Sequence, residues 1–217
     1  MVSMIKRLFA LAFFGFVFVA SGAVAQDEPN GSNRAAFDTV QTATDELLTL
    51  VTQNREVYLQ DTELFFSDVE QLLSSVVDFK RIARRVMAKH YKKAEPEQQQ
   101  AFLDAFKLSL LKVYAKALLE YDNEKIIVLP PHASEKSHAK KQRVDIELYS
   151  SDGKKYPITY SMYLDKENQW KMENVIVNGV NIGLTYRNQF ARLMKDNSND
   201  IDLVIAGWTS DVTEDAE

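Results

Sequence analysis

A change of hydrophobic period near Asn123 is the feature that most limits the fold of this chain. Before it, apolar residues recur every three or four positions, which is typical of amphipathic helices. After it, apolar and polar residues alternate, as they do in strands with one buried face. Helices followed by an antiparallel meander predict an α+β domain in which helices pack on one face of the sheet.

Six helical segments are predicted, four before Asn123 and two after the strands. Asp78 suits an N-cap because its carboxylate can accept the free N–H groups of the first turn. Pro96 suits the first position of a helix, where no N–H donor is needed. The predicted segments are one from Arg34, one over about 59–77, one capped by Asp78, one from Pro96 to Tyr121, and two over about 181–195 and 200–207.

The second pattern predicts a sheet of about four antiparallel strands. Ile126–Leu129 is a short buried strand that ends at Pro130. Asp152-Gly153 is a hairpin turn signal, and Gly179 is expected to allow a sharp turn between the last strand and the next helix. The residues expected to face inward are Val144, Ile146, Leu148, Ile158, Tyr160, Met162, Trp170 and Met172.

The first 25 residues predict export to the periplasm. Lys6 and Arg7 precede an uncharged stretch over 8–20, and small residues follow up to Ala25. This is the layout of a secretory signal peptide cleaved after Ala25. The alternative is an uncleaved anchor, but the stretch is shorter than the roughly 20 residues that span a bilayer.

The rest of the chain predicts one domain. Residues 26–33 are expected to be a flexible leader, 34–208 a single α+β domain, and 209–217 a disordered acidic tail. Without the signal, 24 basic and 31 acidic residues give a net charge of −7, which argues against nucleic acid as a partner. The chain has no cysteine, so packing alone must hold the fold in an oxidising compartment.

No catalytic residue, metal site or cofactor is predicted. His132 and His138 lie in a polar loop without a rigid third ligand, and His90 is surrounded by lysines that lower its pKa. Motifs for a nucleophile elbow, a phosphate loop or a dinucleotide turn are absent from the sequence. Together with a compartment that supplies no ATP, these features favour a binding or carrier protein.

Two groups of residues have alternative interpretations. Arg81, Arg84, Arg85 and Lys89 line one side of the third helix, either as a docking face for anionic headgroups or an acidic partner, or as an ordinary solvated face. Large aromatic and methionine side chains can line an adaptable cavity or fill a core. Periodicity alone does not distinguish a hollow core from a filled one.

Three stretches match one known family in order and spacing. They are Asp78-Phe79-Lys80-Arg81-Ile82-Ala83-Arg84 with Pro96-Glu97-Gln98, Phe102, Phe106 and Tyr114; the hairpin leading to Trp170-Lys171; and Val175-Ile176-Val177-Asn178-Gly179-Val180 with Tyr186-Arg187-Asn188-Gln189-Phe190. Over about residues 36–208 the chain resembles the MlaC family, the periplasmic component of the Mla phospholipid transport system, also described as toluene-tolerance auxiliary transport proteins.

The chain departs from the family pattern at one corner. Asn178 stands where the family usually has an acidic residue before Gly-Val, and Asn174 stands where an Asp is expected. Asn181 and Thr185 replace a Ser and an Asn, respectively. These changes remove negative charge while keeping size and hydrogen bonding, so they leave the expected fold intact.

The resemblance implies a non-enzymatic phospholipid carrier. Family members look like a curved antiparallel sheet with helices on one face, enclosing a deep apolar pocket for acyl chains. They exchange lipid with an outer-membrane lipoprotein–porin complex and with an inner-membrane ATP-driven transporter that contains MCE-type subunits. The function implied is the maintenance of outer-membrane lipid asymmetry, with a diacyl phospholipid as ligand.

On this interpretation, the long helix, the sheet and the closing helix line the pocket. Arg187 is expected to anchor the last strand, to meet a headgroup, or to pair with a carboxylate at the core edge. With Arg81, Arg84, Arg85 and Lys89 it forms the candidate set for headgroup or partner docking. The expected lipid-binding residues are Phe106, Leu110, Val113, Tyr114, Ala117, Val144, Ile146, Leu148, Ile158, Tyr160, Met162, Trp170, Met172, Tyr186 and Phe190.

Two other functions stay open from the residues. An exported enzyme acting on an apolar substrate would need an acid or base inside the cavity. Asp145 and Glu147 face outward in the predicted register, although a slip of one residue would reverse them. A periplasmic adaptor with a filled core would differ from a carrier in its cavity volume.

Overall fold

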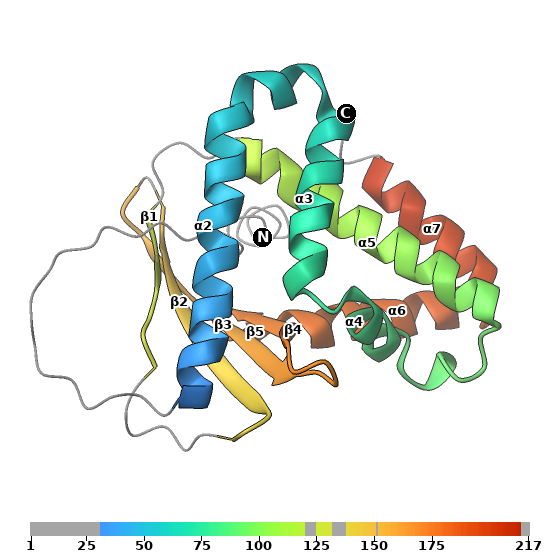
Figure 1. Ribbon diagram of the computed structural model, residues 1–217. Helices are drawn as coiled ribbons and strands as arrows, with labels where there is room; N and C mark the ends of the chain where they lie inside the picture. Colours follow the sequence, from blue (N-terminus) through green and yellow to red (C-terminus); the bar gives the residue numbers. More distant parts are fainter. Residues whose placement is uncertain (1–30, 120–124, 132–137, 151, 214–217) are drawn as a thin grey trace, which may run out of the picture.

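The computed structural model describes residues 31–119, 125–131, 138–150 and 152–213, with side chains left out at 31–33, 113–119 and 209–213. Within these ranges, four α-helices precede a five-stranded sheet and two helices follow it (Figure 1). The helices are α2 (Gly31–Gln60), α3 (Thr62–Val76), α4 (Phe79–Met87), α5 (Pro96–Leu119), α6 (Ile182–Asp196) and α7 (Ile201–Thr213), with a 3₁₀ turn at Ala88–His90. The strands are β1 (Lys125–Val128), β2 (Lys141–Tyr149), β3 (Lys155–Leu164), β4 (Trp170–Val177) and β5 (Val180–Asn181).

Side-chain caps fix where three of the helices begin. Asp61 accepts the N–H of Leu64 at the start of α3, and the predicted cap Asp78 accepts the N–H of Arg81 at 2.8 Å. Asn181 caps α6 in the same way. Each cap satisfies an N–H group that a helix cannot bond internally. None of the helices in the described ranges combines the length and apolar character needed to cross a membrane.

Two helices extend beyond the predicted domain limits of 34–208. The first, α2, begins at Gly31, inside the segment expected to be a leader. The last, α7, continues to Thr213, inside the segment expected to be a disordered tail. Once Trp208 is packed in the core, adding further residues to a formed helix costs little.

The sheet is an open antiparallel meander in which every strand pairs with its neighbour along the chain. Val144 pairs with Tyr160 and Ile146 with Ile158, so these four side chains share one face. All are at most 5% exposed. The predicted register is therefore confirmed, and Asp145 lies on the opposite face, where it pairs with Thr159.

The turn at Asn178-Gly179 differs from the expectation. Both residues have positive φ, +48° and +80°, as a two-residue hairpin turn with the right-handed strand twist requires. It joins β4 to the short β5 through the pair Val177 and Val180, and α6 follows directly. The sharp turn therefore lies between two strands and not between a strand and a helix. In the described part of the chain the sheet has five strands, where about four were predicted.

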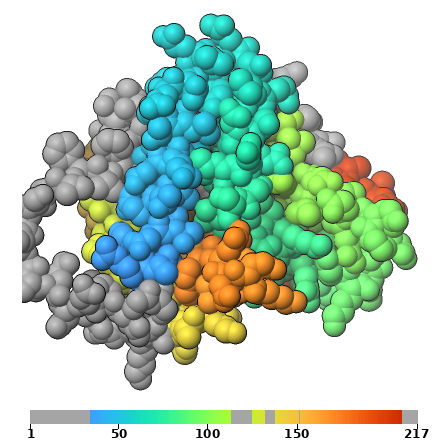
Figure 2. Space-filling view, viewed as in Figure 1, coloured from blue at the N-terminus to red at the C-terminus, as the bar shows by residue number. Residues whose placement is uncertain are grey.

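The helices cover one face of the sheet. The long α2 contacts β1, β2 and β4, whereas α3, α4 and α6 contact β4. Figure 2 shows α2 and α3 packed side by side above the orange segment of the sheet. One apolar cluster joins the inward sheet residues to α2 and α3 through Leu47, Val51 and Phe65.

A second, aromatic cluster joins α4, α5, α6 and α7. The Phe102 ring lies 4.8 Å from the Phe190 ring and 5.1 Å from the Trp208 ring, both edge-on. Trp208 Nε1 donates to Ser109 Oγ at 3.1 Å, so its polar atom is satisfied inside the core. This cluster holds the last two helices against α5 and sets the position of α6 beside α4.

Candidate functional site

The predicted lipid-binding residues of the sheet lie together. All eight are buried, face the helices, and belong to the cluster shared with α2 and α3. They form a continuous apolar floor under the helices. Their inward orientation is confirmed, and contact with lipid stays a prediction. The eight are Val144, Ile146, Leu148, Ile158, Tyr160, Met162, Trp170 and Met172.

The predicted residues of the helices lie elsewhere. Phe106 and Phe190 are fully buried in the aromatic cluster, and Tyr186 packs against Phe106 with ring centroids 5.3 Å apart. Leu110 packs against both clusters and so lies at their junction. The side chains of Val113, Tyr114 and Ala117, on the last turns of α5, lie outside the described residues.

A small apolar cavity lies at the junction of the two clusters. Residues of α3, α4, α5, β4 and α6 line it, and its volume is about 40 Å³. Four of the predicted lipid-binding residues, Phe106, Leu110, Met172 and Tyr186, line it. The other lining residues are Leu73, Val77, Phe79, Ile82, Leu111, Asn174, Val175, Ile182 and Gly183.

The size of this cavity limits what it can hold. A volume of about 40 Å³ admits only a few water molecules. A fatty-acyl chain needs much more space. An apolar void of this kind stays dry. An acyl chain can therefore enter only if the surrounding helices move apart, and a tail-sized cavity stays a prediction.

A β-bulge on β4 turns one carboxylate towards α4. Ser161 pairs with Asn174 and Met162 with Met172, so Glu173 between them has no partner residue on β3. A bulge of this kind re-aims the side chain of the extra residue. Glu173 is 7% exposed, and among the described residues no other Asp or Glu is buried.

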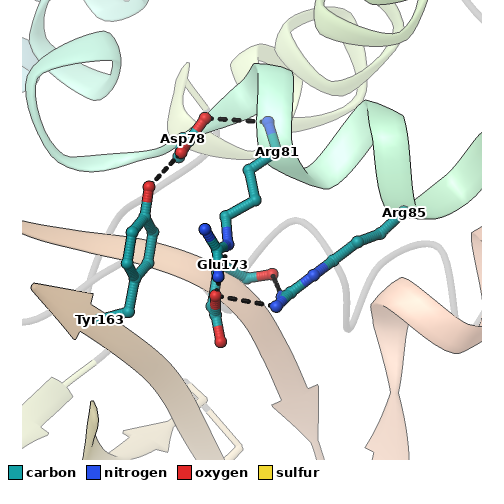
Figure 3. Close-up of polar contacts among 5 residues, drawn as sticks. All are labelled: Asp78, Arg81, Arg85, Tyr163 and Glu173. Carbon is teal, nitrogen blue, oxygen red and sulfur yellow. Dashed lines mark hydrogen bonds and ion pairs between the residues drawn. The ribbon is translucent and has the colours of Figure 1, made fainter. Parts of the chain in front are cut away.

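Two arginines of α4 hold that carboxylate (Figure 3). Arg81 Nε lies 2.6 Å and Arg85 Nη2 lies 2.9 Å from Glu173 Oε2. Arg85 Nη1 also donates to the backbone oxygen of Glu173 at 3.2 Å. Arg81 and Arg85 are one helical turn apart, so both reach the same group. The two guanidinium groups therefore tie this strand residue to α4.

Asp78 and Tyr163 fix the other end of the same contact. The Tyr163 hydroxyl donates to Asp78, whose other oxygen accepts the N–H of Arg81. The Arg81 guanidinium stacks over the Tyr163 ring at 3.9 Å from its centroid. Burial, followed by the hydrogen bond to Asp78, raises the pKa of Tyr163 to about 12, so the phenol remains protonated as a donor.

The predicted docking residues gather in a groove between α4 and α6. This α4–α6 groove has a volume of about 640 Å³. Arg84, Arg85, Lys89 and Arg187, all predicted for docking, line it together with Lys92. Within the described part of the chain, no carboxylate pairs with Arg187, and its side chain is exposed. Arg81 instead lines a second groove.

The second groove lies between α4, α5 and the β3–β4 turn, with a volume of about 840 Å³. Seven basic residues line it together with four carboxylates, those of Asp78, Asp104, Asp165 and Glu167. Val77 and Phe79 separate it from the apolar cavity, because they line both. The mixed charge of its walls makes it less selective for an anion than the α4–α6 groove.

Asparagines build the corner at which the chain departs from the family pattern. Asn174 Oδ1 accepts the N–H of Gly183 at 3.1 Å, and Asn181 Oδ1 accepts the N–H of Leu184. Thr185 Oγ1 donates to the backbone carbonyl oxygen of Asn181 at 3.0 Å. The corner is therefore held by neutral hydrogen bonds, which carry no negative charge next to the α4–α6 groove.

Two parts of this arrangement are missing from the sequence analysis. Glu173 was not singled out, although two arginines one turn apart on a partly buried helix indicate a nearby carboxylate. The residues that α3 and α4 contribute to the cavity are also absent from the predicted pocket wall. Their signal was the apolar stripe that includes Leu73, Phe79 and Ile82.

Four of the six helices in the described ranges, α2, α3, α4 and α6, contact an open antiparallel sheet, and α5 and α7 pack on these helices. This arrangement defines the class, a small α+β domain with an apolar layer between helices and sheet. The same fold occurs in the phospholipid-binding protein from Ralstonia solanacearum, solved in complex with a phospholipid. The TM-score is 0.73 at 25% identity, and the match covers 84% of this chain and 99% of that chain.

The sequence comparisons identify the family. The MlaC protein family matches residues 41–210, and the chain belongs to it. The toluene tolerance protein ttg2D of Pseudomonas putida is 37% identical over 99% of this chain and 94% of its own length. The intermembrane phospholipid transport system binding protein MlaC of Haemophilus influenzae is 23% identical over 82% of this chain and 81% of its own length.

Proposed function

We propose that this protein is a periplasmic phospholipid carrier. The observation that carries the proposal is the likeness in fold and sequence to the phospholipid-bound protein from Ralstonia solanacearum. The family membership and the 37% identical toluene tolerance protein support the same function. The buried apolar floor of the sheet provides the surface on which acyl chains would lie.

The physical task of such a carrier sets its design. Exposing hydrocarbon to water costs about 0.8 kcal/mol per CH₂, so a lipid with two C16 tails loses on the order of 20 kcal/mol on leaving a bilayer. The carrier must offer nearly equal burial, or the lipid would not enter. It must not offer much more, or the lipid would not leave.

Uptake of an acyl chain requires the interior to open. The cavity of about 40 Å³ lies where α4 and α6 meet β4, and Met172 and Leu110 on its walls can repack with little cost. We propose that these walls separate to extend the cavity along the sheet floor. The contact of Arg81 and Arg85 with Glu173 would keep α4 attached to β4 as the walls move.

The proposed partners are two membrane complexes. One is the outer-membrane lipoprotein–porin complex, and the other is the inner-membrane ATP-driven transporter with MCE-type subunits. Exchange with both would serve outer-membrane lipid asymmetry, with ATP hydrolysis setting the direction. The signal peptide predicted to end at Ala25 would deliver the carrier to the periplasm. The mass of the protein recovered from periplasmic extracts tests that cleavage.

The proposed function includes no catalytic step. An enzyme acting on an apolar substrate would need an acid or base within the apolar interior. Asp145 lies on the outer face of β2, and Glu173 lines the α4–α6 groove, where two arginines hold it. The relatives are also named as binding and tolerance proteins.

A second candidate is a periplasmic adaptor with a filled core, which the small volume of the cavity favours. Extraction of the purified protein with organic solvent, followed by mass spectrometry, separates the two. A carrier releases diacyl phospholipid in an amount comparable with the protein. An adaptor releases none above the amount found with an unrelated periplasmic protein purified in the same way.

A further inference from the structure

We propose that the α4–α6 groove docks an acidic surface of a partner protein. The proposal rests on the carrier function above, because a carrier must meet the proteins that load and unload it. It assigns this contact to one place on the molecule and gives the chemistry of the partner.

The groove concentrates positive charge in an acidic protein. The whole chain has a net charge of −5, yet Arg84, Arg85, Lys89, Lys92 and Arg187 line this one groove. Four of these five form no ion pair with any residue that the structure describes. Like charges held close together favour the approach of an anionic surface.

The only carboxylate that lines the groove, among the described residues, is already neutralised. Glu173 is buried and pairs with Arg81 and Arg85. This contact also fixes the Arg85 side chain before any partner arrives, which lowers the entropic cost of docking. The asparagine side chains at the neighbouring corner add no negative charge.

The walls also offer apolar surface. Leu184, in the first turn of α6, is 50% exposed. Tyr91 is half-buried, and the Arg84 guanidinium carbon lies 5.7 Å from the centroid of its ring. Protein interfaces combine aromatic and arginine side chains with apolar contacts in this way. A groove that bound only inorganic anions would gain nothing from an exposed leucine.

The shape favours a protein over a bilayer. The cations come from α4, the turn after it and α6, and they line a concave space of about 640 Å³. A flat membrane surface would contact only its rim, whereas a protruding helix or loop can contact both walls. These five cations are also more than are needed to bind the single phosphate of one lipid headgroup.

The groove is separated from the apolar cavity by a wall of three residues. Ile82, Asn174 and Gly183 line both spaces, and the hydrogen bond from Gly183 to Asn174 closes this wall. While this wall is closed, a headgroup in the groove has no path to the apolar cavity. A docked protein could instead contact α6, whose first turn forms part of that wall.

The test uses the purified, lipid-loaded protein and two probes. One probe is a short, fluorescently labelled peptide rich in glutamate and leucine, and the other is a vesicle of phosphatidylglycerol. Arg187→Glu and Lys89→Glu change the groove. Arg192→Glu is the matched control, because Arg192 is an exposed arginine of the same helix that does not line the groove.

We expect the peptide to bind the wild-type protein and to lose about tenfold or more in affinity with either groove variant. Arg192→Glu should keep peptide affinity within about twofold. Equal losses in all three variants, or no peptide binding, would overturn the proposal. Vesicle binding that depends on Arg187 without peptide binding would also overturn it, in favour of a membrane-facing surface.

A lipid measurement on the same samples separates this proposal from the carrier function. Co-purified phospholipid should be the same in wild type and in Arg192→Glu, because Arg192 lines neither the groove nor the apolar cavity. Lipid missing from the wild type would count against the carrier function. Peptide results from such a sample would still report on the groove by itself.

Discussion

Oδ1 of Asn174 on β4 accepts a 3.1 Å hydrogen bond from the backbone N–H of Gly183 in the first turn of α6. The approach is so close that a Cβ atom added at Gly183 would lie 2.5 Å from this oxygen. This contact fixes α6 against the sheet and closes the wall between the groove and the apolar cavity. Only glycine allows it without displacing Asn174.

The first prediction concerns this contact. Gly183→Ala should destabilise the protein by about 1–2 kcal/mol, because Asn174 must rotate away and the N–H loses its acceptor. Gly207→Ala is the matched control, because Gly207 is an exposed glycine within α7 with no neighbour within 4 Å of an added Cβ. It should stabilise by about 0.5–1 kcal/mol. Urea unfolding measures both, and equal effects would show that the close approach carries no energy.

The second prediction concerns the carboxylate at the bulge. Glu173→Gln removes the charge that Arg81 and Arg85 share, and should cost roughly 1–3 kcal/mol in the free energy of unfolding. The half-exposed arginines regain water, which keeps the loss below that of a fully buried pair. Glu167→Gln, at an exposed position in the β3–β4 turn, should change stability by less than about 0.5 kcal/mol. Indistinguishable midpoints in urea for the two variants would contradict this.

The third prediction is a pH dependence. His90 is 8% exposed and lies 5.9 Å from the Phe190 ring. Burial, followed by the charges of Lys89 and Lys93, lowers the pKa of His90 below 6.5. The unfolded chain therefore binds a proton that the folded protein excludes, so stability must fall as the pH drops below about 6.5.

The comparison variant for that effect is His90→Leu, which cannot titrate. Its stability should decline less than that of the wild type between about pH 7.5 and pH 5.5. Unfolding in urea at several pH values gives the two slopes. Parallel slopes would mean that His90 takes up its proton without a penalty in the folded state.

The fourth prediction tests the apolar floor. Ile146→Trp places a large ring on the inner face of β2 and should reduce the amount of co-purified phospholipid. Arg143→Trp adds the same ring at an exposed position of the same strand and should leave lipid content unchanged. Far-ultraviolet circular dichroism checks that both variants fold. A full lipid content in folded Ile146→Trp would move the acyl chains away from this floor.

Features of the fold that depend on neighbouring residues alone are predictable from the sequence. The alternation of Val144, Ile146 and Leu148 with charged residues has the two-residue period of a strand, so the buried face followed directly. Asp78 was identified as a cap because its carboxylate needs only the N–H groups that follow it. The class of fold followed from the order of these elements along the chain.

The features that were missed depend on distant parts of the chain. The bulge at Glu173 arises because β4 carries one residue more than the facing segment of β3, which a single strand cannot reveal. Its partners Arg81 and Arg85 lie on a helix that precedes the sheet. The size of the cavity is also not predictable from the sequence. Periodicity gives the buried face of a helix but not how closely two buried faces pack.

The order of strands in the sheet has a consequence for how the molecule assembles. Because β1 to β5 pair in chain order, each pairing closes a hairpin, and no strand must wait for a remote partner. Topologies with such short sequence separations fold quickly. With no thiols to oxidise, assembly needs no disulfide isomerase. Refolding after dilution from urea should therefore give the same yield in reducing and oxidising buffers.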